Sequence, residues 1–368
     1  MKITVHQKTL ADAVLNIQRA VSTKSTIPAL EGILLKAGNN ELTLNGYNLE
    51  LGMTTTLPAS VEEPGSIILS ARLFSDIVRR MPGEQLTITV DNRQVAQIVC
   101  GASSFSIIGI PAEEFPEFPA VSQTTSFKME HKVLKSMIRQ TIFAISQSDA
   151  KPVHTGSLFE LEDGVLHVVS VDGYRLAMRC ENVNFDGSLS FVVPGKTLSE
   201  VLKLLSDDDS EVTICVGPRH ILFTIHGYTV LSNLLEGEFL DYRAAIPRDS
   251  STVIKMRTRD LMDSVERVSL LITDRVKSPV RSVFEENSVK LSCSTAMGRA
   301  ADQSPCTMEG SPVEMGFNNR YLLDALHNAE DDEIRIELRG PLSPMKILPL
   351  QGESYLFLVL PVRLKNEG

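Results

Sequence analysis

The sequence predicts a fold of mixed helices and strands in which one unit of about 120 residues occurs three times. Two patterns predict it: amphipathic helical stretches recur at a constant spacing, and short alternating strands flank them. The length agrees, because 368 residues at roughly 150 residues per domain suggest two or three domains. With 43% hydrophobic and 22% charged residues, the chain has the composition of a globular protein with a buried core.

The clearest repeat is a helix with one basic side. Its three copies are RLFSDIVRRM, KTLSEVLKLL and RYLLDALHNA, at residues 72–81, 196–205 and 320–329. Their first residues are 124 positions apart both times. Each copy has a basic or histidine residue at its first and eighth positions, which fall on one side of a helix. Apolar residues occupy the opposite side, so each stretch predicts an amphipathic helix.

A second helix repeats with the same offset. HQKTLADAVLNIQRAV starts at His6 and EHKVLKSMIRQTIFAI at Glu130, and in the third copy, TRDLMDSVERVSLL, Arg259 takes the basic position. A short alternating strand precedes each helix (ITV, FKM and VIKM), and another follows each helix of the first kind (LTITV, EVTICV and EIRIEL). With polar linkers near 120–126 and 247–252, we expect domains at 1–120, 127–247 and 252–364. A domain duplication without functional meaning is the plainer alternative.

Positive charge is concentrated on the predicted helices. The six helical stretches together carry +8, although the whole chain carries −10 and has a pI near 5.3. These stretches are 8–24, 71–81, 128–139, 194–206, 255–267 and 318–330. If they share one surface, that surface suits the phosphates of a polyanion, without reading its sequence. Ordinary solvated faces with aliphatic lysine stems are the alternative.

Signals for catalysis or a bound cofactor are weak. The Gly-Lys-Thr at 195–197 lacks the earlier glycine of a phosphate loop, since Ser190 stands there. No CxxC, HExxH or GxSxG pattern occurs. We interpret Asp207–Asp209 as a solvated turn, and His220 and His226 as strand or turn residues rather than metal ligands. The sequence therefore predicts neither a cofactor nor a metal site, although an active site assembled from distant residues is an alternative.

The chain carries no sign of export or membrane insertion. Its five cysteines lack paired spacing, which fits a reducing cytoplasm. No apolar run approaches the ~20 residues needed to span a bilayer, and MKITVHQKTL lacks the apolar core of a signal peptide. We expect a cytoplasmic protein without a membrane partner.

Four motifs make the chain resemble a known family. They are SVDGYRLA at 170–177, EGEFLDYRAAIP at 236–247, MGFNNRYLLDAL at 315–326 and LPVRL at 360–364. With the start MKITV and with IPAEEFPEF at 110–118, they occur in the order and spacing of the bacterial DNA polymerase III beta subunits, the beta sliding clamps. The resemblance runs over almost the whole chain.

The resemblance implies an α+β fold of three clamp domains, each with two helices and antiparallel sheets. Two subunits would pair head to tail into a ring, with the helices lining the hole and the sheets outside. Such a ring is not an enzyme: it encircles duplex DNA without sequence preference and tethers the replicative polymerase. The implied partners are DNA, a second copy of the chain, the polymerase alpha subunit, the clamp loader, and other polymerases and repair proteins.

The resemblance also implies a pocket for short clamp-binding segments with Gln, Leu and Phe anchors. Its members would be His154, Val171, Gly173, Tyr174, Arg175, Leu176, Leu240, Ala245, Asn318, Tyr321, Pro344, Leu358, Leu360, Pro361, Val362 and Arg363. We expect Leu176, Leu360 and Val362 to desolvate an anchor, Gly173 to allow close backbone approach, and Arg175 to hydrogen-bond the segment. Without the resemblance, Leu360 and Val362 fit an ordinary core strand and Gly173 a turn.

Several positions depart from the family pattern. Ala244 stands where the pattern has Arg, Leu240 replaces a Pro, and His154 replaces a Leu. The tail 365–368 extends beyond the usual terminal leucine. These departures leave partner preference open.

Two further surfaces follow from the resemblance. The DNA-facing residues would be Lys8, Lys24, Arg72, Arg79, Lys132, Lys135, Arg139, Ser148, Lys196 and Lys203, with Ser148 in place of a Gln. The dimer interface would join Phe105 and Ile107 on an edge strand to Leu271 and Ile272 on the third-copy helix. Intramolecular core is the alternative for these four.

Two other classes of function stay open from the sequence. One is an enzyme with a site between repeated domains, which a cluster of acid and base residues would support. The other is a peptide-binding adaptor of the same fold that never encircles DNA, which a monomer in solution would favour.

Overall fold

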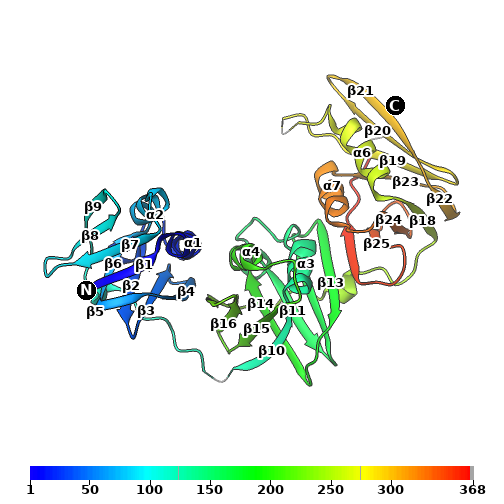
Figure 1. Cartoon of the computed structure of the whole chain (residues 1–368). Coiled ribbons are helices and arrows are strands. Elements are labelled where there is room, and N and C mark those ends of the chain that lie inside the picture. The colour runs from blue at the N-terminus through cyan, green and yellow to red at the C-terminus, as the bar shows by residue number, and fades with distance from the viewer. Residues whose placement is uncertain (123, 274, 365–368) are drawn as a thin grey trace. The chain divides into compact units, whose positions relative to one another are not determined.

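The computed structural model describes residues 1–122, 124–273 and 275–364, and these form two compact units (Figure 1). Unit 1 consists of Met1–His131 and Lys203–Leu234; unit 2 consists of Lys132–Leu202 and the chain from Leu235 onward. The middle predicted copy contributes to both units. The predicted domain ranges therefore stay a prediction.

Unit 1 contains two antiparallel sheets. The first has five strands, in the order β5 (Ser60–Glu63), β1 (Lys2–His6), β7 (Gln85–Val90), β8 (Val95–Cys100) and β9 (Ser103–Ile108). The second has eight, in the order β10 (Thr125–Glu130), β15 (Glu211–Val216), β16 (His220–Ile225), β17 (Tyr228–Asn233), β4 (Leu51–Pro58), β3 (Glu41–Tyr47), β2 (Gly32–Gly38) and β6 (Gly65–Ser70). The β17–β4 pair joins the second copy to the first, with Val230 opposite Met53.

Two helices pack against each other in unit 1, namely α1 (Gln7–Ile17) and α2 (Ala71–Arg80). In α2 the apolar Phe74, Ile77 and Val78 are buried, whereas Arg72 and Arg79 are exposed, as the periodicity predicts. Short 3₁₀ turns occupy Gln18–Ala20, Pro28–Glu31 and Ala112–Glu114.

Unit 2 also contains two antiparallel sheets. The larger has nine strands, in the order β14 (Ser188–Pro194), β11 (Gly156–Glu162), β12 (Val165–Val171), β13 (Arg175–Asn182), β26 (Tyr355–Val359), β25 (Met345–Pro349), β24 (Glu333–Leu338), β18 (Thr252–Arg257) and β22 (Thr307–Gly310). The smaller has four, in the order β21 (Gly298–Pro305), β20 (Ser288–Thr295), β19 (Val280–Glu285) and β23 (Val313–Phe317). The β13–β26 pair joins the second copy to the third.

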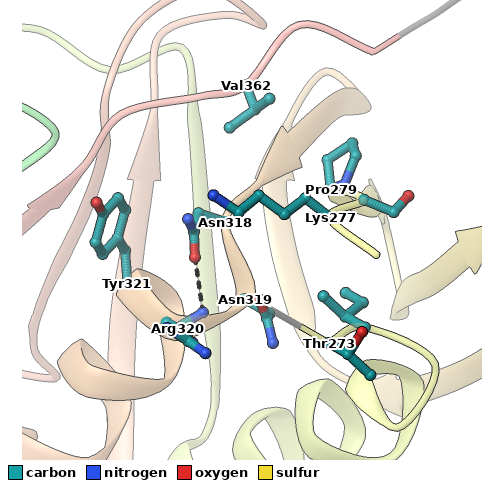
Figure 2. A pocket seen from close by; sticks show the side chains of 10 residues that line it. Thr273, Lys277, Pro279, Asn318, Asn319, Arg320, Tyr321 and Val362 are labelled. Atoms are coloured by element: carbon teal, nitrogen blue, oxygen red, sulfur yellow. Dashed lines mark hydrogen bonds between the residues drawn. The ribbon is translucent and has the colours of Figure 1, made fainter. Parts of the chain in front are cut away.

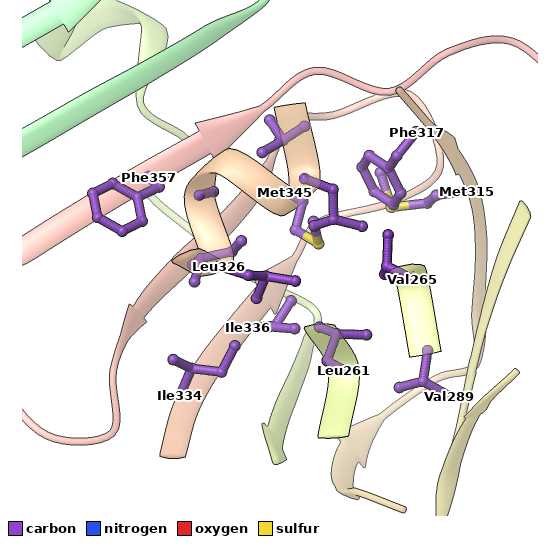
Figure 3. Close-up of a cluster of buried hydrophobic side chains, with 14 of the residues drawn as sticks. Leu261, Val265, Val289, Met315, Phe317, Leu326, Ile334, Ile336, Met345 and Phe357 are labelled. Carbon is purple, nitrogen blue, oxygen red and sulfur yellow. The ribbon is translucent and has the colours of Figure 1, made fainter. Parts of the chain in front are cut away.

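The helices of unit 2 hold its sheets together. They are α3 (His131–Ile142, whose first residue belongs to unit 1), α4 (Gly195–Leu204, whose last two residues belong to unit 1), α5 (Tyr242–Ala245), α6 (Thr258–Ser269) and α7 (Asn319–Asn328), with a 3₁₀ turn at Pro152–Thr155. Figure 3 shows the core that α6 and α7 cover, where Leu261 and Val265 of α6 and Leu326 of α7 meet Phe317 and Ile336 from two sheets. Burying each such side chain contributes about 1.5–3 kcal/mol.

The structure confirms the α+β class, the six predicted helices and the predicted alternating strands. Two details differ. Leu271 and Ile272 are not on a helix, because α6 ends at Ser269 and the chain turns there, with the Ile272 amide donating to the Ser269 carbonyl at 2.8 Å. The four-residue α5 was not predicted, since one turn is too short to show a helical period. Among the residues described, no helix is long and apolar enough to cross a membrane.

Candidate functional site

A pocket of about 430 Å³ opens in unit 2 between the start of α7, the loop after α6 and the C-terminal segment (Figure 2). Three of the predicted pocket residues line it: Asn318, Tyr321 and Val362. The other lining residues are Ile272, Thr273, Lys277, Ser278, Pro279, Asn319 and Arg320. Ile272 was predicted at the dimer interface, so the structure places part of that surface beside the pocket.

Backbone hydrogen bonds fix the C-terminal segment along the pocket. The Leu360 amide donates to the Tyr174 carbonyl at 2.9 Å, and the Val362 amide donates to the Gly316 carbonyl at 2.7 Å. Both side chains remain exposed, Val362 at 41%. Pro361 is half-buried between them and Arg363 is exposed. The segment therefore presents two apolar side chains that a ligand could cover.

The Asp172–Arg175 turn supplies the aromatic wall beside this segment. The Asp172 carboxylate accepts the amides of Tyr174 and Arg175 at 2.9 and 3.1 Å. Gly173 has a φ of +91°, which favours glycine, and open space surrounds it. Gly173 thus supports the turn conformation, and the close approach of a ligand backbone stays a prediction. The turn stacks Tyr174, 61% exposed, on Tyr321 with ring centroids 5.8 Å apart.

Arg175 is engaged within the protein, and its predicted hydrogen bond to a ligand stays a prediction. Its Nε donates to Asp172 at 2.9 Å, and its Nη1 pairs with Asp324 of α7. Its guanidinium also lies 4.7 Å from the centre of the Tyr321 ring. With 12% of its side chain exposed, Arg175 ties the turn to α7, and we interpret it as a positioning residue.

Other predicted members lie beneath or around these groups. Val171, Leu176 and Leu358 are already buried, and Leu176 and Leu358 share a core with Val153 and Tyr242. They are core residues, so Leu176 does not present the exposed surface that was expected to desolvate an anchor. The His154 ring contacts Phe239 edge-on, and burial lowers the pKa of His154.

Two predicted members lie at the α5 turn and are exposed: Leu240 precedes the turn and Ala245 ends it. Asp241 caps the turn by accepting the Ala244 amide at 3.3 Å. The Tyr242 hydroxyl donates to Glu160 at 2.6 Å, and Arg243 pairs with the same carboxylate at 2.6 Å. Burial raises the pKa of Glu160, but these two hydrogen bonds together with the nearby positive charges lower it overall. The remaining member, Pro344, is half-buried in the loop before β25.

In unit 1, the basic residues of α2 face a hollow. A pocket of about 650 Å³ is lined by Arg72 and Arg79 together with Gln18 and Thr23 from the end of α1 and the loop after it. Arg79 also pairs with Asp76 at 3.2 Å. Lys8 and Lys24 are exposed. Lys203, also in unit 1, is exposed as well.

In unit 2, the basic residues are more strongly engaged. Arg139 of α3 pairs with Glu330, which also accepts from Ser136 at 3.1 Å. Lys132 and Lys196 are exposed and Lys135 is half-buried. Ser148 is exposed in the loop after α3, where its amide donates to Ser146 at 3.1 Å. Glu330, which follows α7, thus pairs with part of the predicted positive face.

The predicted interface residues divide between the two units. Phe105 and Ile107 lie on β9, which is an edge strand as predicted. Phe105 is 45% exposed, and Ile108, which was not predicted, is 82% exposed. After α6 the exposed side chain is Leu270, at 79%, whereas Leu271 and Ile272 are half-buried.

A group that the sequence did not indicate lies elsewhere in unit 1. His131, Asp208 and His226 have ligand-type atoms within 4.8 Å of one another. They are separated by 77 and 18 positions along the chain, so no spacing motif could have revealed them.

Comparisons with known proteins explain this arrangement. Models of the DNA polymerase III beta subunit match the N-terminal, central and C-terminal domains at residues 1–119, 128–241 and 243–363. The chain belongs to the DNA polymerase III beta-subunit family. It is 32% identical to the beta sliding clamp of Bacillus subtilis over 99% of this chain and all of that protein. The beta sliding clamp of Halalkalibacterium halodurans is 31% identical with the same coverage.

Solved structures agree. The DNA polymerase sliding clamp of Bacillus subtilis superposes with a TM-score of 0.96 at 31% identity, covering 99% of this chain and 100% of that chain. A DNA polymerase III beta subunit from Eubacterium rectale gives 0.94 at 32% identity, covering 98% and 99%. This family member is therefore a DNA sliding clamp of DNA replication, a processivity factor rather than an enzyme. The tail 365–368 lies outside the described residues.

Proposed function

We propose that two copies of this chain close head to tail into a ring around duplex DNA, and that the unit 2 pocket holds short segments of its partners. The partners would be the polymerase alpha subunit, the clamp loader, and other polymerases and repair proteins in the cytoplasm. The family membership supports DNA and a DNA polymerase as partners. The closed ring, the residues that form its interface and its DNA-facing surface, and the remaining partners are our proposal.

The pattern of strand pairing between copies supports the ring most directly. The same pairing occurs twice within the chain, and the two strands that could form it a third time lie at sheet ends in the part of the chain described. β4, β13 and β21 take equivalent places in the three copies, and so do β9, β17 and β26. β17 of copy two pairs with β4 of copy one, and β26 of copy three pairs with β13 of copy two. By the same rule β9 should pair with β21 of the copy that precedes copy one, which a second chain would supply.

The two strands left over have the properties of interface edges. β9 ends the five-stranded sheet and β21 ends the four-stranded sheet in the part of the chain described. An edge strand with exposed Phe105 and Ile108 invites pairing unless something covers it. Pairing β9 with β21 would complete a nine-stranded sheet, the size of the sheet that spans copies two and three. A head-to-tail contact that recurs in two steps closes into a ring.

The helices supply the charge that a DNA-encircling ring needs. Lys8, Lys24, Arg72 and Arg79 in unit 1 and Lys132, Arg139 and Lys196 in unit 2 are exposed. Phosphate contacts of this kind are independent of sequence and are weakened by salt. Weak contacts of this kind allow sliding.

The pocket supplies the partner site. Exposed Val362, Leu360 and Tyr174 beside a 430 Å³ hollow suit an extended segment with apolar anchors. An anchor buried there contributes about 1.5–3 kcal/mol.

A topological experiment tests the ring. The chain is loaded by the clamp loader of the same bacterium and ATP onto a nicked circular plasmid, which is then isolated and cut once. We expect the protein to stay on the circle and to leave after cutting, because a ring slides off free ends. Protein that stays bound after cutting, or that never remains on the circle, would contradict encirclement; a monomer that still binds clamp-binding peptides would indicate an adaptor.

A further inference from the structure

Three segments of unit 1 converge on one hydroxyl group. The Ser206 Oγ lies 3.0 Å from Nδ1 of His131 and 2.9 Å from Nε2 of His226, and it also hydrogen-bonds the Asp208 side chain. The two imidazole rings meet edge to face with centroids 4.3 Å apart. A hydroxyl has one proton and can donate to only one of these three groups at a time. His131, Asp208 and His226 therefore compete for hydrogen bonds with the Ser206 hydroxyl.

The chemistry of the set is that of a transition-metal site. Two imidazole nitrogens and one carboxylate are ligands that Zn²⁺ and related ions prefer. Neutral imidazole and ionised carboxylate are the forms that bind metal.

The geometry is close to what such an ion needs. The ligand atoms lie within 4.8 Å of one another, whereas neighbouring ligands of tetrahedral Zn²⁺, at bonds of about 2.1 Å, are about 3.4 Å apart. Closing this difference takes movements on the order of 1 Å and a rotation of the Ser206 side chain. His226 and Asp208 are exposed on turns, and His226 has a φ of +48° beside Gly227 at +80°. His131, fully buried, supplies the fixed ligand.

We propose that His131, Asp208 and His226 bind one transition-metal ion of the Zn²⁺ class, with the Ser206 hydroxyl moving aside or becoming the fourth ligand. The ion links the first residue of α3, the turn after α4 and the β16–β17 hairpin. Because β17 is also the strand that pairs with β4, the ion stabilises the sheet that joins copies one and two. None of the three proposed ligands is among the residues predicted for the partner pocket or for the DNA-facing surface.

Metal titration of the intact chain tests the proposal. The chain is stripped with chelator, and Co²⁺ binding is followed by its visible absorption, then displaced with Zn²⁺. We expect one ion per chain, without the thiolate charge-transfer band that any of the five cysteines would add. The His226→Ala and Asp208→Asn variants should each bind at least ~10-fold more weakly, whereas Ser206→Ala should still bind. His220→Ala, on the strand that leads to His226, is the matched control and should bind normally.

A second readout separates binding from folding. Zn²⁺ should raise the melting temperature of the native chain and of His220→Ala, but not that of His226→Ala. Three results would each overturn the proposal: no saturable binding, equal binding by the native chain and His226→Ala, or a thiolate band that assigns the ion to cysteine. Because both altered ligands are exposed, loss of fold is not expected to obscure the outcome.

Discussion

The junction between copies one and two and the free edge of copy one use equivalent strands in opposite ways. At the junction, β17 pairs with β4, and Met53 and Val230 are fully buried. At the edge, β9 is the strand equivalent to β17, yet Phe105 and Ile108 are exposed. The same strand position thus has a pairing strand at the junction, whereas at β9 it forms the edge of a sheet. The contrast shows that a strand position paired at the junction ends a sheet at β9 in the described chain, and we propose that a second copy pairs with it.

The largest expected effect comes from removing the exposed apolar side chains of β9. Phe105→Ala with Ile108→Ala should convert dimers to monomers, because two side chains each worth about 1.5–3 kcal/mol leave the interface. The dimer dissociation constant should rise by about 10²–10⁴-fold for each of the two interfaces in the ring, as sedimentation experiments would measure. Val362→Asp, in the pocket, is the control and should remain dimeric. A double variant with an unchanged dissociation constant would show that β9 is not the interface.

Leu271 and Ile272 were predicted on the other side of the interface, and the structure places them after α6 rather than on it. Substitutions there test this side of the proposed interface. Leu271→Ala with Ile272→Ala should also weaken the dimer, as the resemblance implies. Leu270→Ala should do so at least as strongly, because Leu270 is the more exposed side chain. If only the half-buried pair matters, the effect comes from repacking of the chain itself and not from the interface.

Breaking the junction should affect stability instead. Met53→Ala removes a fully buried side chain from β4 and should lower the free energy of unfolding by about 2–5 kcal/mol. Denaturant titration measures it, and the exposed Ile108→Ala should change stability by no more than about 0.5 kcal/mol under conditions where both chains are monomeric. Equal losses at the two positions would remove the distinction between junction and edge.

The pocket should respond independently of the edge. A labelled Gln-Leu-Ser-Leu-Phe peptide should bind the native chain, and Val362→Asp should weaken binding by about 10–100-fold, since it places a charge where an anchor packs. Fluorescence anisotropy measures this, with a melting curve to verify folding. Phe105→Ala with Ile108→Ala should bind the peptide normally. Loss of binding in that edge variant would mean that the pocket needs the dimer.

Substitutions on the basic helices should have smaller effects, on the salt dependence of DNA binding, and these effects should differ between the two units. Arg72→Gln should reduce the salt dependence of DNA binding by about one phosphate contact. Arg139→Gln should have less effect, because Glu330 already pairs with that guanidinium. Binding of short duplexes across a salt series measures both. A larger effect at Arg139 would mean that DNA displaces Glu330.

The smallest effect is a pH dependence of stability. Burial, followed by the neighbouring Arg243, lowers the pKa of His167 below its ordinary 6.5. Below that pH the unfolded chain binds a proton that the folded chain does not, so His167 makes stability fall as pH falls, by at most about 1.4 kcal/mol per pH unit. His167→Gln should flatten the dependence of stability on pH between pH 6.5 and 5. An unchanged profile would show that His167 titrates alike in both states.

The sequence predicts features formed by residues close together along the chain, but not contacts between residues that are far apart in the sequence. Local periodicity was enough for α2 and for β7, and the 124-residue offset was enough for the three copies. The β17–β4 and β13–β26 pairs could not be predicted from pattern, because strand pairing between distant segments leaves no local mark. Arg139–Glu330 and Arg175–Asp324 are separated by 191 and 149 positions. For the same reason the sequence placed Arg139 at DNA and Arg175 at the ligand without showing the carboxylates that engage them.

One measurement tests the central claim, that β9 pairs with β21 of a second copy. A photo-crosslinking residue is placed at Ser106, which is exposed on β9, and the products are mapped by mass spectrometry. We predict a product of twice the chain mass in which residue 106 is joined to the segment 298–305. Products that join 106 to 103–108 of another chain, as a head-to-head dimer would give, or that contain no second chain at all, would contradict it.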